Sequence, residues 1–181
     1  MVTFGIKKAR YGYIVIDDFW VGGRDAKNEL YTDKNRFPSA SNGIMNSVDQ
    51  QTGLEKYAGP GGWNDPDLLV TGLFGKEKSS SENGRFKGCS LTEYRSQFIL
   101  WCMMASPRML NLDIRSLDRD TRNIILDKAL IAINQDSLGN QASSIYKKNN
   151  LEVFKKELTG HRYAICVLNR SGDSQNFSLN L

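Results

Sequence analysis

Apolar residues in the first 140 positions form short runs and one long helical stretch. Residues 13–16 are continuously apolar and end at Asp17 and Asp18, and the mainly apolar residues 109–112 end at Asp113. Short continuous apolar runs are typical of strands that are buried on both faces. Acids at strand ends suggest an α/β part, because α/β folds place their active sites at the carboxyl ends of strands.

The longest helix is predicted between residues 91 and 106. Ser90 and Glu93 have the spacing of a capping box at its start, and Pro107 would stop it. Its apolar residues cover most of its circumference, so we expect it to be largely buried. Two shorter helices are predicted. One lies within residues 43–57 and ends at Gly53; the other is capped by Asp118 or Asp120, runs through 126 and continues over 129–133 after a kink.

The pattern changes after about residue 141. Strands are predicted over 151–157, 162–169 and 175–181, with turns at 159–161 and 171–173. The last of these strands alternates apolar and polar residues, as a half-buried strand does. We therefore expect residues 141–181 to form an antiparallel β part that is separate from residues 1–140.

Charge and apolar content argue against two classes of partner. The 181-residue chain has a net charge of +4, but pairs such as Lys147–Lys148 and Lys155–Lys156 are scattered. Scattered lysines predict solvated surface rather than a nucleic-acid interface. No apolar run approaches the roughly 18 residues of a membrane span. Residues 1–10 lack a signal-peptide pattern, which leaves the compartment open.

Cysteine and histidine content gives no reason to expect a metal or another cofactor. Cys89, Cys102 and Cys166 do not have metal-ligand spacing. Cys102 falls within the long apolar helix and is predicted to be a buried free thiol. The single histidine, His161, lies in a predicted turn and is expected at the surface.

Residues 59–69, GPGGWNDPDLL, concentrate groups that suit a sugar. Pro66 fixes its own φ and excludes Asp65 from the helical region, so Asp65 and Asp67 are held in an extended frame next to Trp63. Carboxylates accept hydrogen bonds from sugar hydroxyls. An indole offers a flat face to sugar C–H groups. The alternative is a Pro/Gly turn with solvated acids.

The acids at the two strand ends also have alternative interpretations. Asp17 and Asp18 could belong to an active site at the end of the strand. Alternatively, one of them could cap neighbouring amides where the strand enters a loop. For Asp113, an ion pair with Arg115 is the favoured interpretation.

Four segments together resemble the α-galactosidase (melibiase) family of retaining glycoside hydrolases. They are YIVIDDFW at 13–20, YAGPGGWNDPDLL at 57–69, YRSQFILWCMMASPRMLNL at 94–112 and IAINQDSLG at 131–139. Their order and local spacing agree with the family, and the string GPGGWNDPD is specific. The resemblance implies a (β/α)8 barrel followed by a C-terminal antiparallel β domain. Residues 1–140 would then be a partial barrel, and 141–181 the truncated C-terminal β domain.

The resemblance also implies a ligand and roles for four residues. The ligand is terminal α-linked galactose, or N-acetylgalactosamine in a close relative. Asp17 and Asp18 resemble the family pair that accepts hydrogen bonds from galactose hydroxyls. Asp67 resembles a further sugar-contacting acid, and Leu68 stands where a methionine is common. The expected partner is therefore a galactoside or galactose, with no nucleic acid or membrane.

Compared with the family, the chain is expected to be internally shortened. A barrel of this kind takes roughly 250 residues, whereas about 140 precede the β part here. Between about residues 39 and 43 the chain passes from the second strand region to the segment before the seventh. No residue matches the family's nucleophile or its acid/base Asp. Phe19 replaces a usual cysteine, so one family disulfide is not expected.

The sequence therefore predicts a relative that keeps part of the galactose-binding wall without the catalytic pair. Retaining hydrolysis needs two carboxyl groups about 5 Å apart, and the family's sugar-binding acids do not supply them. A partial barrel exposes sheet edges, which self-association could cover. The alternatives are hydrolysis completed by another chain, a non-catalytic galactose-binding remnant or inactive fragment, and a purely structural protein.

Overall fold

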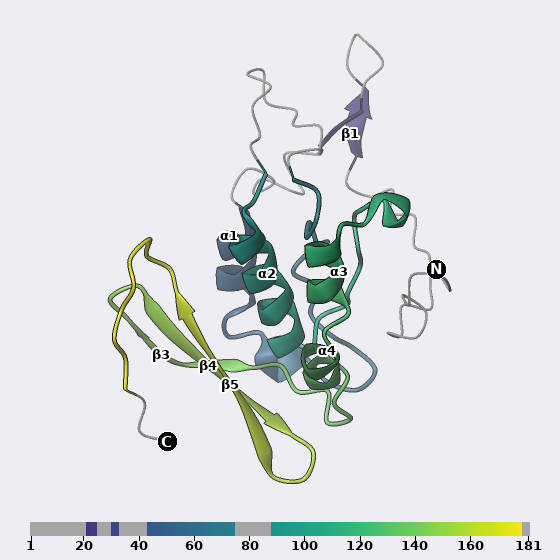
Figure 1. The fold of residues 1–181 in the computed structure, drawn as a ribbon. Helices are drawn as coiled ribbons and strands as arrows, with labels where there is room; N and C mark the ends of the chain where they lie inside the picture. The colour runs from purple at the N-terminus through teal and green to yellow at the C-terminus, as the bar shows by residue number, and fades with distance from the viewer. Residues whose placement is uncertain (1–20, 25–29, 33–42, 75–87, 179–181) are drawn as a thin grey trace. The chain divides into compact units, whose positions relative to one another are not determined.

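A computed structural model describes residues 21–24, 30–32, 43–74 and 88–178 of the chain (Figure 1). The predicted strand at 13–16 and the residues Asp17, Asp18 and Phe19 lie outside these ranges. The chain divides into two compact units. The first unit contains residues 1–51, 66–98 and 108–128, and the second contains 52–65, 99–107 and 129–181.

The first unit carries a short hairpin that the sequence pattern did not predict. Strand β1 (Val21–Arg24) pairs antiparallel with β2 (Leu30–Thr32). Helix α1 (Gly43–Gln51) confirms the helix predicted in this region. Its Val48 is buried, and Gly53, which follows it, has a φ of +85°. A positive φ is readily adopted by glycine and ends the helix as expected.

Helix α2 (Leu91–Met103) begins with the predicted capping box. The Ser90 amide donates to Glu93 Oε2 at 2.7 Å, and the Glu93 amide donates to Ser90 Oγ at 3.3 Å. Hydrogen bonds from the Ser90 amide and the Ser90 hydroxyl to the Glu93 carboxylate hold the pKa of Glu93 below its ordinary value. Most of the helix is buried, as its apolar content predicted: Tyr94, Gln97, Phe98, Leu100, Trp101, Cys102 and Met103.

The predicted end of α2 at residue 106 is wrong, because the helix ends at Met103. Ala105 has a φ of +53°, the Ala105 amide donates to Cys102 O at 3.2 Å, and the Ser106 amide donates to Trp101 O at 3.1 Å. This is a Schellman ending with alanine in the position that usually holds glycine. Without a glycine, the sequence gives no stop signal before Pro107.

The predicted strand at 109–112 is reduced to a single bridge within the first unit. Leu69 pairs with Leu110 in parallel: the Leu69 amide donates to Met109 O at 2.8 Å, and the Asn111 amide donates to Leu69 O at 3.0 Å. Leu69 is fully buried. A short 3-10 turn, η2 (Ile114–Ser116), follows.

Two further helices match their predicted positions. Helix α3 (Arg119–Ile125) is capped by Asp118, whose side chain accepts from the amides of Asp120 and Thr121. Burial would raise the pKa of Asp118, but these hydrogen bonds hold it below its ordinary value. Helix α4 (Lys128–Asn134) confirms that residues 129–133 are helical, but it is a separate helix and not the kinked continuation of α3 that was predicted.

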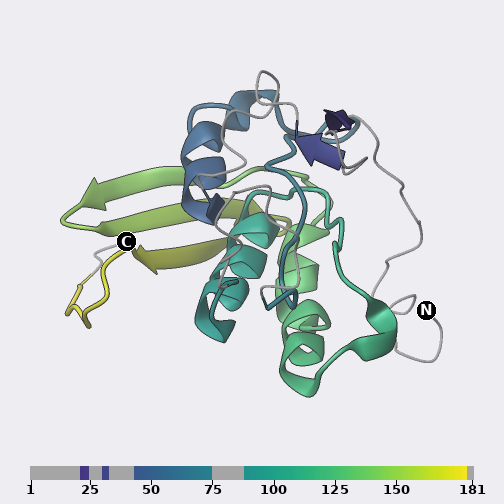
Figure 2. The ribbon, with the colours of Figure 1, turned by 90° about the horizontal axis from the view of Figure 1, so that it is seen from above.

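The second unit contains a three-stranded antiparallel sheet, drawn in green to yellow in Figures 1 and 2. Its order is β3 (Ser143–Lys148), β4 (Leu151–Leu158), β5 (Arg162–Asn169). The turn at 159–161 joins β4 to β5, and His161 is exposed as expected. The unit also includes the 3-10 turn η1 (Glu55–Tyr57).

Three expectations for this region need correction. Strand β3 was not predicted, because its sequence SSIYKK is mostly polar, as an edge strand can be. Residues 175–178 form no strand; Phe177 instead contacts Tyr146 with ring centroids 5.3 Å apart. Lys156 is buried and only 1% exposed, so reading the Lys155–Lys156 pair as solvated surface was wrong.

Candidate sugar-contacting segment

Asp67 and Leu68 are the predicted sugar contacts that fall within the described residues. Asp67 is exposed and has a φ of +92°, an uncommon conformation for a residue other than glycine. Its Oδ1 accepts from the Leu68 amide at 2.6 Å. The carboxylate is thus folded back over the peptide that follows it, at the surface of the first unit.

The chain after Asp67 is bonded on both of its edges. On one edge, Leu69 pairs with the 109–111 segment through the parallel bridge. On the other edge, the buried side chain of Gln97 from α2 donates from Nε2 to Leu68 O at 3.1 Å. Gln97 Oε1 accepts from the Val70 amide at 3.1 Å. The backbone that presents Asp67 is therefore fixed by groups far away in the sequence.

The first half of the GPGGWNDPD string has a structural role in the second unit. Trp63 Nε1 donates to Gly139 O at 3.2 Å, although the residue remains 46% exposed. Asn64 Nδ2 donates to Leu54 O and to Gln141 Oε1, each at 2.8 Å. Trp63, which was predicted to offer its ring face to a sugar, therefore also connects its loop to Gly139.

The INQDSLG segment at 133–139 forms hydrogen bonds to several other parts of the second unit. In the sequence, only the family resemblance pointed to this segment. Buried Asn134 donates from Nδ2 to Ser106 O at 3.0 Å, next to the end of α2. Asp136 Oδ1 accepts from the amide and the hydroxyl of Thr159, both at 3.0 Å. Burial would raise the pKa of Asp136, but the hydrogen bonds from Thr159 and Leu138 and the charge of Arg162 hold it below its ordinary value.

Gly139 is a position where a side chain would be strained, and it provides a test of this packing. Its φ is +64°, and a Cβ there would lie 3.1 Å from Pro60 Cδ and 3.2 Å from Trp63 Nε1. We expect Gly139→Ala to lower the free energy of unfolding by about 2 kcal/mol, from left-handed backbone strain plus displacement of Trp63. Urea unfolding measures this loss.

The matched control for that substitution is Gly62→Ala, next to Trp63 in the loop that Gly139 contacts. Gly62 does not have a positive φ, and a Cβ there meets nothing within 4 Å. If both variants lose the same free energy of unfolding, the loss in Gly139→Ala does not come from a specific contact at Gly139.

Asp113 and Asp118, two other acids of the first unit, are engaged in local structure. Arg115 Nη2 lies 2.8 Å from Asp113 Oδ2, which confirms the predicted ion pair. With the Asp118 cap, Asp113 lines a small cavity of about 130 Å³ in the first unit. No group of three or more His, Cys, Asp or Glu among the described residues could hold a metal ion.

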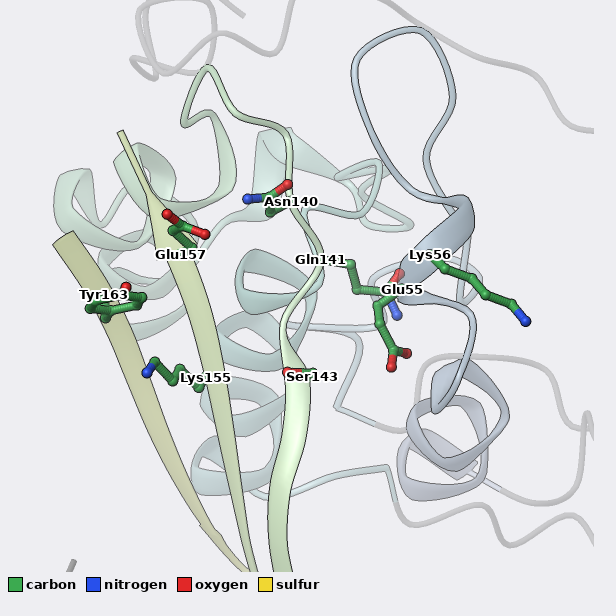
Figure 3. A pocket seen from close by; sticks show the side chains of 8 residues that line it. All are labelled: Glu55, Lys56, Asn140, Gln141, Ser143, Lys155, Glu157 and Tyr163. Carbon is green, nitrogen blue, oxygen red and sulfur yellow. The ribbon is translucent and has the colours of Figure 1, made fainter. Parts of the chain in front are cut away.

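A larger hollow of about 360 Å³ lies in the second unit (Figure 3). Lys155, Glu157 and Tyr163 line it from β4 and β5, with Lys155 Nζ 4.1 Å from the centroid of the Tyr163 ring. Glu55 and Lys56 come from η1, and the Lys56 side chain points away from the others. Asp67 and Leu68 are not among the described residues that line this hollow.

Cys89, Cys102 and Cys166, all within the described residues, form no disulfide bond, and Cys102 is buried as predicted. Burial raises the pKa of Cys166 to about 11, which disfavours its thiolate form at neutral pH. Among the described residues, every helix is too short or too polar to cross a bilayer.

Comparison with known proteins identifies the same family as the four sequence segments. A family model described as "Alpha galactosidase A" (Melibiase_2) matches residues 41–136. Alpha-galactosidase A of Cellvibrio japonicus is 38% identical over 138 residues, which is 76% of this chain and 31% of that protein. An alpha-galactosidase of Oryza sativa subsp. japonica is 40% identical over 129 residues, 71% of this chain and 28% of that protein.

A solved structure of the same family also resembles this chain. The crystal structure of a candidate alpha-galactosidase/melibiase from Bacteroides fragilis superposes with a TM-score of 0.66 at 46% identity, covering 71% of this chain and 27% of that one. The chain thus spans under a third of the length of these curated relatives. Because the family model covers more than half of the residues, this chain belongs to the α-galactosidase (melibiase) family of glycoside hydrolases.

Proposed function

We propose that this chain is an α-galactosidase relative that binds the terminal α-linked galactose of a galactoside. Asp17, Asp18 and Asp67 would accept hydrogen bonds from the sugar hydroxyls, and Leu68 would contact the ring. In this proposal residues 1–140 are a partial (β/α)8 barrel, and residues 141–181 are the truncated C-terminal β domain. Family membership supports the class of substrate, since the curated relatives are named α-galactosidases.

The conformation of Asp67 is the observation that carries the proposal. An exposed carboxylate at a φ of +92° is costly to maintain, and such residues cluster at ligand sites. An ionised carboxylate can also accept hydrogen bonds from two hydroxyls at once. The bond from the Leu68 amide orients Asp67 Oδ1 before any ligand arrives, which reduces the entropy that binding would cost.

We further propose that the isolated chain binds galactose without hydrolysing galactosides. No position matches the family's nucleophile or its acid/base. Retaining hydrolysis needs both carboxyl groups about 5 Å apart, and the chain spans under a third of its curated relatives. Hydrolysis by an assembly in which another chain supplies the pair is the alternative.

The test compares galactose with glucose, which differs only at C4, in a thermal shift assay. At galactose about ten times its dissociation constant, the full chain should be stabilised by about 1.4 kcal/mol, which raises its melting temperature by roughly 3 °C. Asp67→Asn should abolish the shift, because asparagine tolerates a positive φ but lacks the charge. An aryl α-galactoside should show no turnover above background.

Asp120→Asn is the control, because Asp120 is exposed on α3 in the same unit. This variant should respond to galactose as the original chain does. Equal shifts with galactose and glucose, or an unchanged shift in Asp67→Asn, would reject the binding proposal. If the original chain hydrolyses the aryl α-galactoside and Asp17→Asn does not, the proposal that the isolated chain lacks hydrolase activity is rejected.

A further inference from the structure

We propose that Gln97 is a positioning residue: its side-chain amide replaces a neighbouring strand for residues 68–70 and thereby holds Asp67 in its ligand-ready conformation. The inference rests on the proposed role of Asp67 in galactose binding. Gln97 itself does not contact the sugar in this proposal. It acts through the backbone that follows Asp67.

The directions of the backbone groups lead to this assignment. In the parallel bridge, both the amide and the carbonyl of Leu69 face the 109–111 segment. Along a strand, successive residues direct these groups to opposite edges. Leu68 O and the Val70 amide therefore face the other edge, where a further strand would normally pair with them.

Gln97 supplies the missing pair of hydrogen-bonding groups. Its Nε2 donates to Leu68 O at 3.1 Å, and its Oε1 accepts from the Val70 amide at 3.1 Å. One primary amide thus provides the donor and the acceptor that a strand would provide. Asparagine is one methylene shorter, and glutamate would lack the donor, so the match is specific to glutamine.

Burial makes this contact strong. Gln97 is 2% exposed, and buried polar groups are costly unless they are paired. Its oxygen also accepts from Thr71 Oγ1 at 3.2 Å, which ties the next residue to the same group. Gln97 is anchored on helix α2, so the position of residues 68–70 is set by a buried helix.

Fixing residues 68–70 also fixes Asp67. The Leu68 amide donates to Asp67 Oδ1, and the Leu68 carbonyl belongs to the peptide that Gln97 holds. If residues 68–70 could rotate, the Asp67 backbone could relax from its φ of +92° toward a common conformation. The carboxylate would then be displaced from the position at which it meets the sugar.

The first test uses the unmodified full chain, because a variant could fail to fold. A through-hydrogen-bond coupling between the Val70 amide nitrogen and the side-chain carbonyl carbon of Gln97 should be detectable by NMR. The Gln97 side-chain protons should exchange slowly with solvent. Fast exchange together with an absent coupling would overturn the proposal without reference to any ligand.

The second test compares Gln97→Met with Thr71→Val. Methionine has a similar length but no hydrogen-bonding amide, so Val70 amide exchange should rise at least tenfold and galactose affinity should fall about tenfold. Thr71→Val removes the hydroxyl that bonds to Gln97 Oε1 and to Tyr94 O but leaves both contacts of Gln97 with the backbone, so affinity should stay within about twofold. A folded Gln97→Met variant with unchanged Val70 exchange would reject the positioning role.

The two proposals can fail separately. If the original chain does not bind galactose, the proposed function fails, while Val70 exchange still decides whether Gln97 holds the backbone. If Gln97→Met changes Val70 exchange but leaves galactose affinity unchanged, Gln97 is structural and the positioning role is rejected.

Discussion

Arg170→Ala is expected to lower the free energy of unfolding by about 3 kcal/mol, because it leaves a buried carboxylate without its main partner. The Glu152 side chain is 1% exposed on the central strand β4. Arg170 Nε and Nη2 both contact Glu152 Oε2. Ser144 Oγ at 2.9 Å and Lys147 Nζ at 3.4 Å remain as weaker partners, so the loss should lie at the lower end of the range for buried pairs. Urea unfolding of the two proteins measures it.

Arg115→Ala is the matched control, because it removes an arginine from an exposed ion pair. Arg115 and Asp113 also form a two-point contact, but their side chains are 86% and 46% exposed. Exposed pairs contribute little to stability, so the unfolding curve of Arg115→Ala should be close to that of the original chain. Similar losses in both variants would show that burial of Glu152 is not the cause.

The second large effect concerns the buried lysine on the same strand. Lys156 Nζ donates to Cys102 O at 3.1 Å and to Ile133 O at 2.8 Å, which are carbonyls in the last turns of α2 and α4. Burial lowers the pKa of Lys156 to about 8, although Cys102 and Asp136 oppose this shift. A cation at helix C-termini is favourable, but here it has lost its hydration.

The direction of the pH dependence follows from this pKa. The unfolded chain releases the Lys156 proton near pH 10.5, and the folded chain releases it near pH 8. Between these values the unfolded state holds more protons, so raising the pH favours the folded state. Relative to a Lys156→Met variant, the original chain should gain about 3 kcal/mol of stability from pH 8 to 10.5.

Unfolding curves of both proteins at several pH values test this expectation. Other groups titrate in the same range, but they do so in both proteins and cancel in the difference. Stability differences that stay constant with pH, or that fall as the pH rises, would contradict a lowered pKa for Lys156.

Local sequence signals predicted those parts of the fold that depend on neighbouring residues. The Ser90–Glu93 box and the Asp118 cap are read from residues within one helical turn, and both are present. The end of α2 was misplaced because Ala105 adopts a conformation that its residue type does not signal. Strand β3 was missed because a polar edge strand is stabilised by its partner and not by its own pattern.

The candidate site shows the same division between local and long-range information. The sequence predicted the chemistry of residues 59–69, but not that Trp63 and Asn64 would bond to Gly139 and Gln141. These contacts join segments more than 70 residues apart. Likewise, the sequence predicts Lys156 to be a surface residue. It is buried because its side chain packs against the ends of α2 and α4.

The proposed function requires that Asp17, Asp18 and Asp67 bind the same galactose molecule. Its most direct test is a crystal structure of the full chain grown with saturating galactose. We expect carboxylate oxygens of Asp67 and of the Asp17–Asp18 pair within about 3 Å of hydroxyls of the same sugar. A sugar bound elsewhere, or Asp67 on a different face from the other two acids, would contradict it.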